Sequence, residues 1–295
     1  MHPAPSIILF TTLSGLGFGL LFWLGLGLPS VTGLAAFLWF AAAYLMAVGG
    51  LAASAFHLGN PQRALLAFSQ WRSSWLSREA CLSVAALLVM AAFGAGLVFW
   101  QLPLRTFGWP GAALCLATVF ATSMIYAQLK TVPRWNHWTT SALFLALSLA
   151  GGAGFTGQHA LTAVLMLAAG VVQIAVWSLG DRRFTARGST MATATGLGAI
   201  GTVRQFSPPH TGTNYLLREM VFRIGRKHAL RLRALSILLM ALIPAGLLLL
   251  LPGATGTALA MPCHVAGVLA SRWLFFAEAE HVVGLYYGVE PAKTL

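Results

Sequence analysis

The sequence predicts an all-α, polytopic integral membrane protein with eight transmembrane helices, and three observations support this prediction. Of the 295 residues, 58% are hydrophobic and 8% are charged, whereas soluble domains carry roughly 25% charged residues because a water-facing surface must be solvated. Several apolar stretches are long enough to cross about 30 Å of hydrocarbon, which takes about 20 helical residues. The 18 Lys and Arg residues gather in the connections between these stretches, as membrane topology requires.

The predicted spans follow one another through a single membrane domain over residues 1–295. The first begins near Ile7 with no Lys or Arg before it, so it lacks the charged start of a cleavable signal peptide and is interpreted as a span. Glycines blur the boundary between the fifth and sixth spans. An even number of spans places both termini on one side, which we name side A. The predicted spans are 7–28, 32–56, 78–100, 109–129, 138–156, 160–179, 232–251 and 257–285.

The distribution of positive charge predicts the orientation. Of the 18 Lys and Arg residues, Arg105 lies on the opposite side, side B, Arg272 lies inside the eighth span, and the other 16 lie on side A. Cytoplasmic connections carry an excess of Lys and Arg, so both termini are expected in the cytoplasm and the protein in the bacterial inner membrane. Because this clustering accounts for the net charge of +12, we expect the lipid bilayer, and no nucleic acid, as its surroundings.

The connection over residues 181–231 is too long for a simple turn and is strongly basic. Within it the sequence predicts an amphipathic helix that begins after Thr213 or Asn214 as the capping residue. Such a helix can lie on anionic lipid headgroups or serve as a docking feature. Its apolar residues recur at helical spacing: Leu216, Leu217, Met220, Val221 and Ile224.

Three cysteines, Cys81, Cys115 and Cys263, lie far apart inside apolar stretches. There is no C-x-x-C motif and no cluster of Cys and His in the sequence. We therefore expect no iron–sulfur cluster, zinc site or disulfide framework in this chain.

His57 and Glu79 both fall near the side A boundary, at the end of the second span and the start of the third. Ionisable groups at membrane depth are costly and are therefore functional candidates. Reduction of a quinone takes up two protons with two electrons, and a His and a carboxylate beside the ring can exchange those protons. The alternative interpretation is an ordinary first-turn acid beside Arg78 and an ordinary boundary histidine.

The eighth predicted span is unusual because Arg272, Glu278, Glu280 and His281 share one apolar helix. Arg272 is expected about 13 residues from the side A end, roughly 20 Å deep at 1.5 Å per residue. A cation at that depth must face the bundle interior. It is either a buried polar tie between helices or part of a quinone pocket or proton path.

Two other classes of membrane protein remain as alternatives. A b-type cytochrome would need axial histidines at matching depth, and His57 with His281 or His159 with His264 would be the pairs. All four lie at the ends of predicted spans, which disfavours haem. A secondary transporter would use Arg272 and the glutamates as a pathway, but it would also show broken helices in matching halves, and the sequence has no such symmetry.

The run Phe56–Ala64 reads F-H-L-G-N-P-Q-R-A and is followed by L-S-R-E at Leu76–Glu79. These motifs resemble the H-L-G-x-P-x-R-A and L-S-x-E signature of the dimethyl sulfoxide reductase anchor subunit family. Two further matches are Tyr126 with Thr131–Trp135, and Arg272 with Phe275 and Phe276. The resemblance extends over nearly the whole chain in length and helix count.

The resemblance implies a haem-free anchor that binds a quinone, ubiquinone or menaquinone, and holds an iron–sulfur subunit, which in turn contacts a molybdopterin catalytic subunit. Chemistry on the main substrate, the iron–sulfur clusters and the molybdopterin would then belong to partner chains. The family's quinone-site His and Glu fall on His57 and Glu79, and we add Arg63, Tyr126 and Arg272 to the predicted site. The residues predicted to dock the partner are Arg72, Arg134, Arg218, Arg226 and Lys227.

The long basic connection also resembles the sulfite-oxidising branch of this family, whose catalytic subunits face the cytoplasm. We therefore favour a cytoplasm-facing sulfite dehydrogenase that reduces quinone, with a dimethyl sulfoxide reductase that oxidises quinol as the alternative. His281 follows Phe276 at a different spacing from the family's late histidine, so the resemblance assigns it no role.

Overall fold

The computed structural model describes residues 1–56, 60–207, 211–212, 214–221, 228–251 and 253–288. All regular structure in these ranges is helical, which confirms the predicted all-α class. His57, Thr213, Ile224, Arg226 and Lys227 lie outside the described residues.

Seven helical stretches are long and apolar enough to cross a membrane. Another apolar helix, α5, covers Trp138–Ala153 and has 16 residues, about 24 Å at 1.5 Å per residue, which is short for a span. The seven longer stretches are α1 (Pro5–Gly25), α2 (Gly33–Ala55), α3 (Trp75–Phe99), α4 (Arg105–Ala127), α6 (His159–Ala186), Ala229–Leu250 and α11 (Gly253–Ala277).

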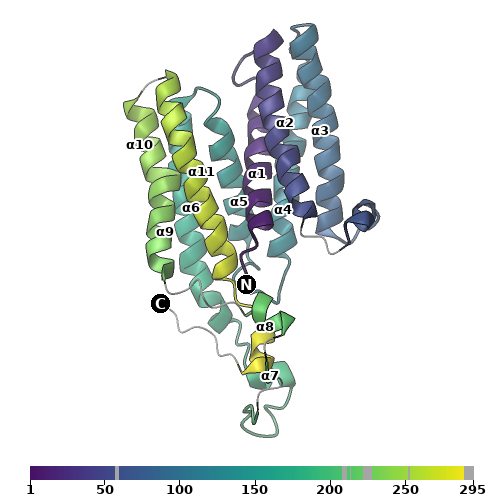
Figure 1. Ribbon diagram of the computed structural model, residues 1–295, viewed down its shortest axis with the longest axis vertical. Helices are drawn as coiled ribbons and strands as arrows, with labels where there is room; N and C mark the ends of the chain where they lie inside the picture. Colours follow the sequence, from purple (N-terminus) through teal and green to yellow (C-terminus); the bar gives the residue numbers. More distant parts are fainter. Residues whose placement is uncertain (57–59, 208–210, 213, 222–227, 252, 289–295) are drawn as a thin grey trace.

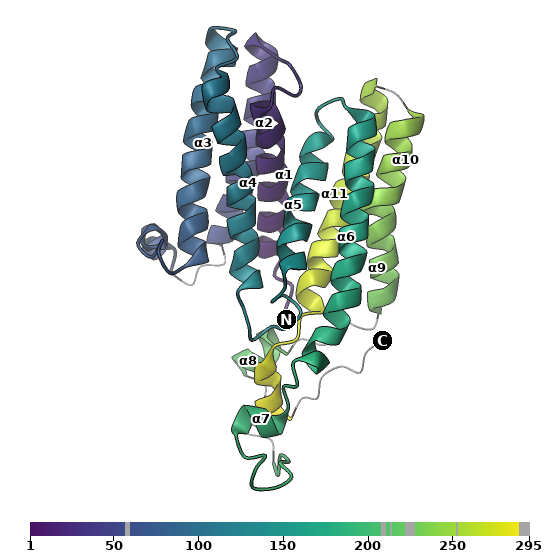
Figure 2. The same ribbon diagram turned by 180° about the vertical axis from the view of Figure 1, so that it is seen from behind.

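The helices form two groups that meet along α1 (Figures 1 and 2). One group contains α1 to α4, and the other contains α5, α6 and the helices from α9 to α11. Close approach depends on small residues: a Cβ atom at Gly19 would collide with the carbonyl oxygen of Ser148 on α5. Burial covers 67% of the most apolar window of α1 and 28% of that of α2. α1 is therefore the central helix of the bundle.

The seventh apolar stretch contains a π-helical turn whose cause is a proline. α9 (Ala229–Ile237) is followed by η3 (Leu238–Leu242) and α10 (Ile243–Leu250). Pro244 has no N–H and cannot donate to the carbonyl of Met240. That carbonyl instead accepts a hydrogen bond from Nδ1 of His264 at 2.6 Å. His264 is fully buried near the middle of α11, so the expectation that it lies at the end of a span is wrong.

The end of α11 also differs from the prediction. The helix stops at Ala277, so Arg272 lies about 8 Å from its end rather than about 20 Å. Glu278, Glu280 and His281 lie beyond the helix, and the expectation that they share it with Arg272 is wrong.

Tertiary hydrogen bonds explain the early end of α11. The N-terminal ammonium of Met1 donates to the carbonyl of Ala279 at 2.7 Å, and the N–H of Val282 donates to the carbonyl of Thr131 at 3.0 Å. These bonds draw the backbone out of helical geometry, and a 3-10 helix, η4 (Val282–Tyr287), follows.

The remaining short helices lie at the side A end of the bundle (Figure 1). They are η1 (Pro61–Phe68), α7 (Met191–Thr195) and α8 (Tyr215–Glu219). Asn214 caps α8 by accepting a hydrogen bond from the N–H of Leu217 at 2.9 Å, which confirms one of the two predicted caps. α8 is shorter than the predicted amphipathic helix, whose second half falls largely outside the described residues.

Candidate functional site

Glu79 lies just after the first turn of α3 with its side chain 4% exposed. Its Oε1 lies 2.5 Å from the hydroxyl of Thr122 on α4, and that hydroxyl is also 3.0 Å from the carbonyl of Thr118. A threonine hydroxyl has one proton and two lone pairs. It can donate to an ionised Glu79, or accept from a protonated Glu79 while donating to Thr118. Both protonation states of this buried carboxyl are therefore hydrogen-bonded.

Tyr126 lies one turn after Thr122 on α4 and is enclosed by aromatic rings. The ring of Trp135 also stacks on Phe275, with centroids 5.0 Å apart and planes at 10°, and its Nε1 donates to the carbonyl of Phe275 at 2.9 Å. Stacked and edge-to-face contacts both stabilise packed aromatic rings, so these side chains form a rigid apolar group. The rings whose centroids lie within 5.8 Å of that of Tyr126 are Trp135, Phe144, Phe275 and Phe276; with Tyr126 they form what we name the aromatic cluster.

Arg272 on α11 reaches the same cluster. Its guanidinium carbon lies 3.7 Å from the ring centroid of Phe144, and the residue is 2% exposed. Its Nε and Nη1 have no hydrogen-bond partner among the described residues. A buried charged group with unused donors is costly. The arrangement therefore favours an acceptor that is not part of the described chain.

The structure brings three of the five predicted site residues together. Glu79 on α3 is hydrogen-bonded to Thr122, one turn before Tyr126 on α4, and Arg272 on α11 contacts Phe144, whose ring centroid lies 5.8 Å from that of Tyr126. Arg63 lies in η1 with an exposed side chain, so it is not part of this buried group. His57 lies outside the described residues. The group offers a carboxyl that can exchange a proton, two free donors and flat aromatic walls.

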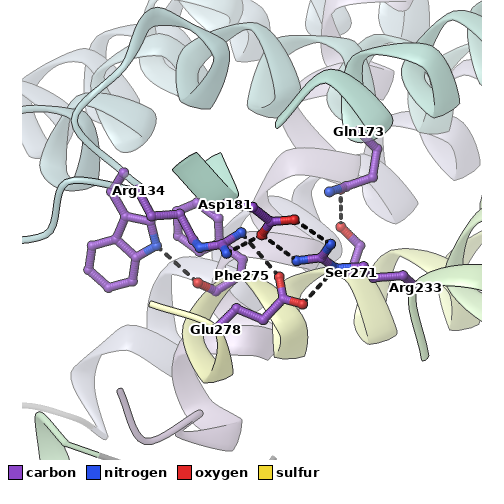
Figure 3. Close-up of polar contacts among 8 residues, drawn as sticks. Arg134, Gln173, Asp181, Arg233, Ser271, Phe275 and Glu278 are labelled. Carbon is purple, nitrogen blue, oxygen red and sulfur yellow. Dashed lines mark hydrogen bonds and ion pairs between the residues drawn. The ribbon is translucent and has the colours of Figure 1, made fainter. Parts of the chain in front are cut away.

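An ionic cluster lies next to the aromatic cluster, and the sequence alone did not predict it. It contains Arg134, Asp181, Arg233 and Glu278, which point toward one another in Figure 3. Arg233 makes two bonds to Asp181, at 2.7 and 2.8 Å, and one to Glu278 at 2.7 Å. Arg134 pairs with Asp181 and, at 3.4 Å, with Glu278.

The ionic cluster joins four segments that are distant in sequence. They are the turn after α4, the end of α6, the start of α9 and the residue after α11. Arg134 precedes Trp135, and Glu278 lies one turn after Phe275, so both clusters share two segments of backbone. One feature of the sequence could have indicated this cluster. Asp181 and Glu278 are two of only six acids in the chain, and a carboxylate within or next to an apolar stretch needs a cationic partner.

The predicted docking residues have different surroundings. Arg72 is exposed beside the ring of Trp71, with 5.5 Å between the guanidinium carbon and the centroid. Arg218 lies on α8. Arg134 points into the ionic cluster, so its predicted contact with a partner would need a different side-chain position. Arg226 and Lys227 lie outside the described residues.

Like His264, His281 has a structural role. Nδ1 of His281 accepts a hydrogen bond from the N–H of Val283 at 3.0 Å and caps η4, and burial together with the N-terminal ammonium lowers the pKa of His281. Nε2 of His159 lies 3.3 Å from the hydroxyl of Thr257, near the side B end, so His159 and His264 are not at matching depth. No group of three or more potential metal ligands occurs within the described ranges.

Comparisons with known proteins agree with the motifs in the sequence. The profile of the family described as DMSO reductase anchor subunit (DmsC) matches residues 2–179. A protein from Allochromatium vinosum that is named as a subunit of sulfite dehydrogenase is 32% identical over 327 aligned positions, which cover 97% of this chain and 99% of that protein. No solved structure matches the chain.

Proposed function

Because the chain belongs to the DMSO reductase anchor subunit family, we propose that it is the quinone-reacting membrane anchor of a molybdenum and iron–sulfur oxidoreductase. The family supplies the membrane anchor of such a complex. The observation that supports quinone chemistry is the placement of Glu79 and Arg272 about the aromatic cluster. We place the quinone ring among these residues.

The residues present fit a quinone in three respects. Its ring is flat and apolar, and the walls formed by Tyr126, Phe144 and Phe275 are aromatic. Its carbonyl oxygens accept hydrogen bonds, and Nε and Nη1 of Arg272 are unused donors. Its reduction consumes protons, and Glu79 is hydrogen-bonded in both protonation states.

A bound quinone would accept two electrons and two protons and leave as the quinol. In this proposal Glu79 gives one proton to the nearer ring oxygen, and Thr122 then turns its hydroxyl toward the newly formed carboxylate. Arg272 donates hydrogen bonds to the other oxygen and offsets the negative charge that electrons bring. The aromatic cluster excludes water. His57 is the proposed second proton donor, on the basis of the family motif alone.

We also propose eight membrane crossings, with α5 as a short one. The N–H of His2 donates to the carbonyl of Glu219 at 2.8 Å, so the N-terminus and the connection after α6 lie on one side. Six crossings separate them if α5 crosses, and five if it does not. An even number is needed, which supports α5 as a span.

Sulfite is the substrate we propose for the catalytic partner, with quinone reduction as the direction of electron flow. The family profile ends at residue 179, before the basic connection, whereas the alignment with the relative from Allochromatium vinosum extends over 97% of the chain. That relative therefore shares the part of the chain that distinguishes the two branches.

The test compares membranes from cells with and without the gene for this chain. Sulfite-dependent reduction of quinone should require the chain, whereas sulfite oxidation by an artificial dye should persist in the soluble fraction. Unchanged sulfite-linked quinone reduction together with lost growth on dimethyl sulfoxide would reverse the choice of substrate and direction.

A further inference from the structure

A small folded region stands beyond the spans at the side A end. It consists of α7, residues 196–207 and η4, and we name it the platform. In both views α7 and the connection that follows it form the tip of the molecule, farther from the bundle than α8 (Figures 1 and 2). The long axis of the bundle runs along the spans, so the platform projects away from the bilayer.

Specific hydrogen bonds build the platform. The hydroxyl of Tyr286 donates to the carbonyl of Ala194 at 2.7 Å and joins η4 to α7. Thr190 and Thr193 form a reciprocal capping box at the start of α7. Asn214, the cap of α8, donates to the hydroxyl of Tyr287 at 3.2 Å. The platform is therefore a defined surface attached to the C-terminal end of α11.

Large apolar side chains are exposed on this surface. Phe206 is 96% exposed and Ile200 is 83% exposed. Exposed apolar residues on the spans are explained by lipid, but the platform lies beyond the spans. η1 differs, because it lies beside the helix ends (Figure 1), where its 81% exposed Leu65 can reach the bilayer surface. Exposed apolar residues that lipid cannot cover indicate a protein partner.

The charge around these residues indicates the chemistry of that partner. Between residues 182 and 221 the described chain contains one acid, Glu219. Its cations are Arg182, Arg183, Arg187, Arg204 and Arg218. Arg183 is engaged with the carbonyls of Pro133 and Asn136, whereas Arg187 and Arg204 are exposed. A region that exposes apolar side chains and an excess of cations complements a partner surface with an apolar pocket and acidic residues.

We propose that the platform is the docking surface for the iron–sulfur subunit, with Phe206 and Ile200 inserted into an apolar pocket of that subunit. Arg204 of the platform and Arg187, which follows α6, face acidic residues of that subunit. This inference rests on the proposed function. The platform continues through η4 into Glu278 and the end of α11, so a subunit bound there sits over the side A end of the aromatic cluster. None of these four residues was among the predicted docking residues.

The first experiment replaces Phe206 with p-benzoyl-phenylalanine in the chain co-expressed with both partner subunits. Illumination should crosslink the anchor to the iron–sulfur subunit, identified by its mass. Phe99, 76% exposed at the side B end of α3, is the matched control and should give no such product. Crosslinking from Phe99 alone, or from neither position, would overturn the proposal.

The second experiment measures iron per anchor chain after purification of the complex. Phe206→Glu with Ile200→Glu should lower retained iron at least tenfold, whereas Phe206→Leu should not. Arg204→Glu should lower retention most at low salt, where charge interactions are least screened, and Arg105→Glu, the same charge change on side B, should not. Full retention in the double variant, with loss of binding to vesicles of anionic phospholipid, would reassign the platform to the membrane.

The wild-type complex separates failure of this inference from failure of the proposed function. If the wild type reduces quinone with sulfite while the platform variants keep their iron, the inference alone is wrong. If the wild type retains the iron–sulfur subunit through the platform but reduces no quinone, the proposed function is wrong and the docking surface stands.

Discussion

At the scale of single residues, Glu79 and Arg272 differ in how many of their hydrogen-bonding atoms find a partner in the chain. Thr122 provides Glu79 with a hydrogen bond in either protonation state, so this carboxyl can be buried without an ionic partner. Arg272 has a ring against one face and two unused donors. If Arg272 served only to hold helices together, its donors would be paired within the protein, because buried polar groups normally are.

We expect Glu79→Gln to lower sulfite-dependent quinone reduction on the order of 100-fold or more, the usual contribution of a general acid. The amide keeps the size of the side chain but cannot release a proton to the ring. Activity with an artificial dye and the amount of assembled complex should stay unchanged. Thr122→Ser, which keeps the hydroxyl, should retain most of the turnover. Wild-type turnover in Glu79→Gln would remove Glu79 from the site.

Arg272→Leu separates a functional role from a structural one. If the guanidinium holds helices together, its loss should lower the melting temperature of the purified protein in detergent. If it serves a bound ring, replacing an incompletely paired buried charge with an apolar side chain should leave the melting temperature unchanged or higher. We expect the second outcome, with the KM for quinone raised at least about tenfold because a charge-assisted hydrogen bond is lost. Arg105→Leu on side B is the control.

At the scale of elements, the ionic cluster joins four segments that are distant in sequence. Opposite charges balance within it, since it contains two arginines and two carboxylates with side chains 6% to 27% exposed. Removal of one partner leaves a charge without compensation, whereas removal of one partner of each sign restores balance.

The double variant Asp181→Leu with Arg233→Met should therefore be more stable than either single variant. Each single substitution should cost on the order of 1–3 kcal/mol, less than for fully buried pairs because Asp181 is partly exposed. Thermal unfolding in detergent, followed by circular dichroism, measures the three values. Additive losses would show that the two side chains do not interact as the 2.7 Å distance indicates.

Some helix boundaries could be predicted from the sequence and others could not. Apolar length located α1 to α4 to within a few residues, because lipid imposes that length on each helix separately. It placed the end of α11 at residue 285 rather than Ala277, because the helix is ended by bonds to Met1 and Thr131, which a local pattern does not contain. The carbonyl of Met240, which Pro244 leaves without a backbone donor, is satisfied by His264 from another helix. The ionic cluster was missed for the same reason.

At the scale of the whole molecule, some residues of the site are visible in sequence motifs, whereas others reach it only through the packing of helices that are distant in sequence. The motifs identified Glu79, Tyr126 and Arg272 separately, and the fold brings them to one place from three helices. The enclosing rings were partly visible in the sequence as Trp135, Phe275 and Phe276, whereas the position of Phe144 depends on the packing of α5 against α4 and α11. The platform was not predicted, because its exposed apolar residues carry no periodic pattern.

The proposed orientation of the molecule rests on contacts between segments that are distant in sequence. The ammonium of Met1 contacts Ala279 and the N–H of His2 contacts Glu219, so the N-terminus, the segment after α11 and the basic connection share one side. The sequence predicts that 16 of the 18 Lys and Arg residues lie on that side, and the positive-inside rule then predicts that it is the cytoplasmic side. A reporter at one of these places therefore reports on all three.

We expect green fluorescent protein fused after Leu295 to fluoresce and alkaline phosphatase at the same place to be inactive, because the distribution of Lys and Arg predicts that both termini face the cytoplasm. Alkaline phosphatase fused after Leu102, in the connection between α3 and α4, should be active. A reporter between α5 and α6, after Gly157, isolates the short helix: active phosphatase there requires that α5 crosses. Inactive phosphatase after Gly157 together with active phosphatase after Leu295 would mean that α5 stays on side A, in conflict with the contact between His2 and Glu219.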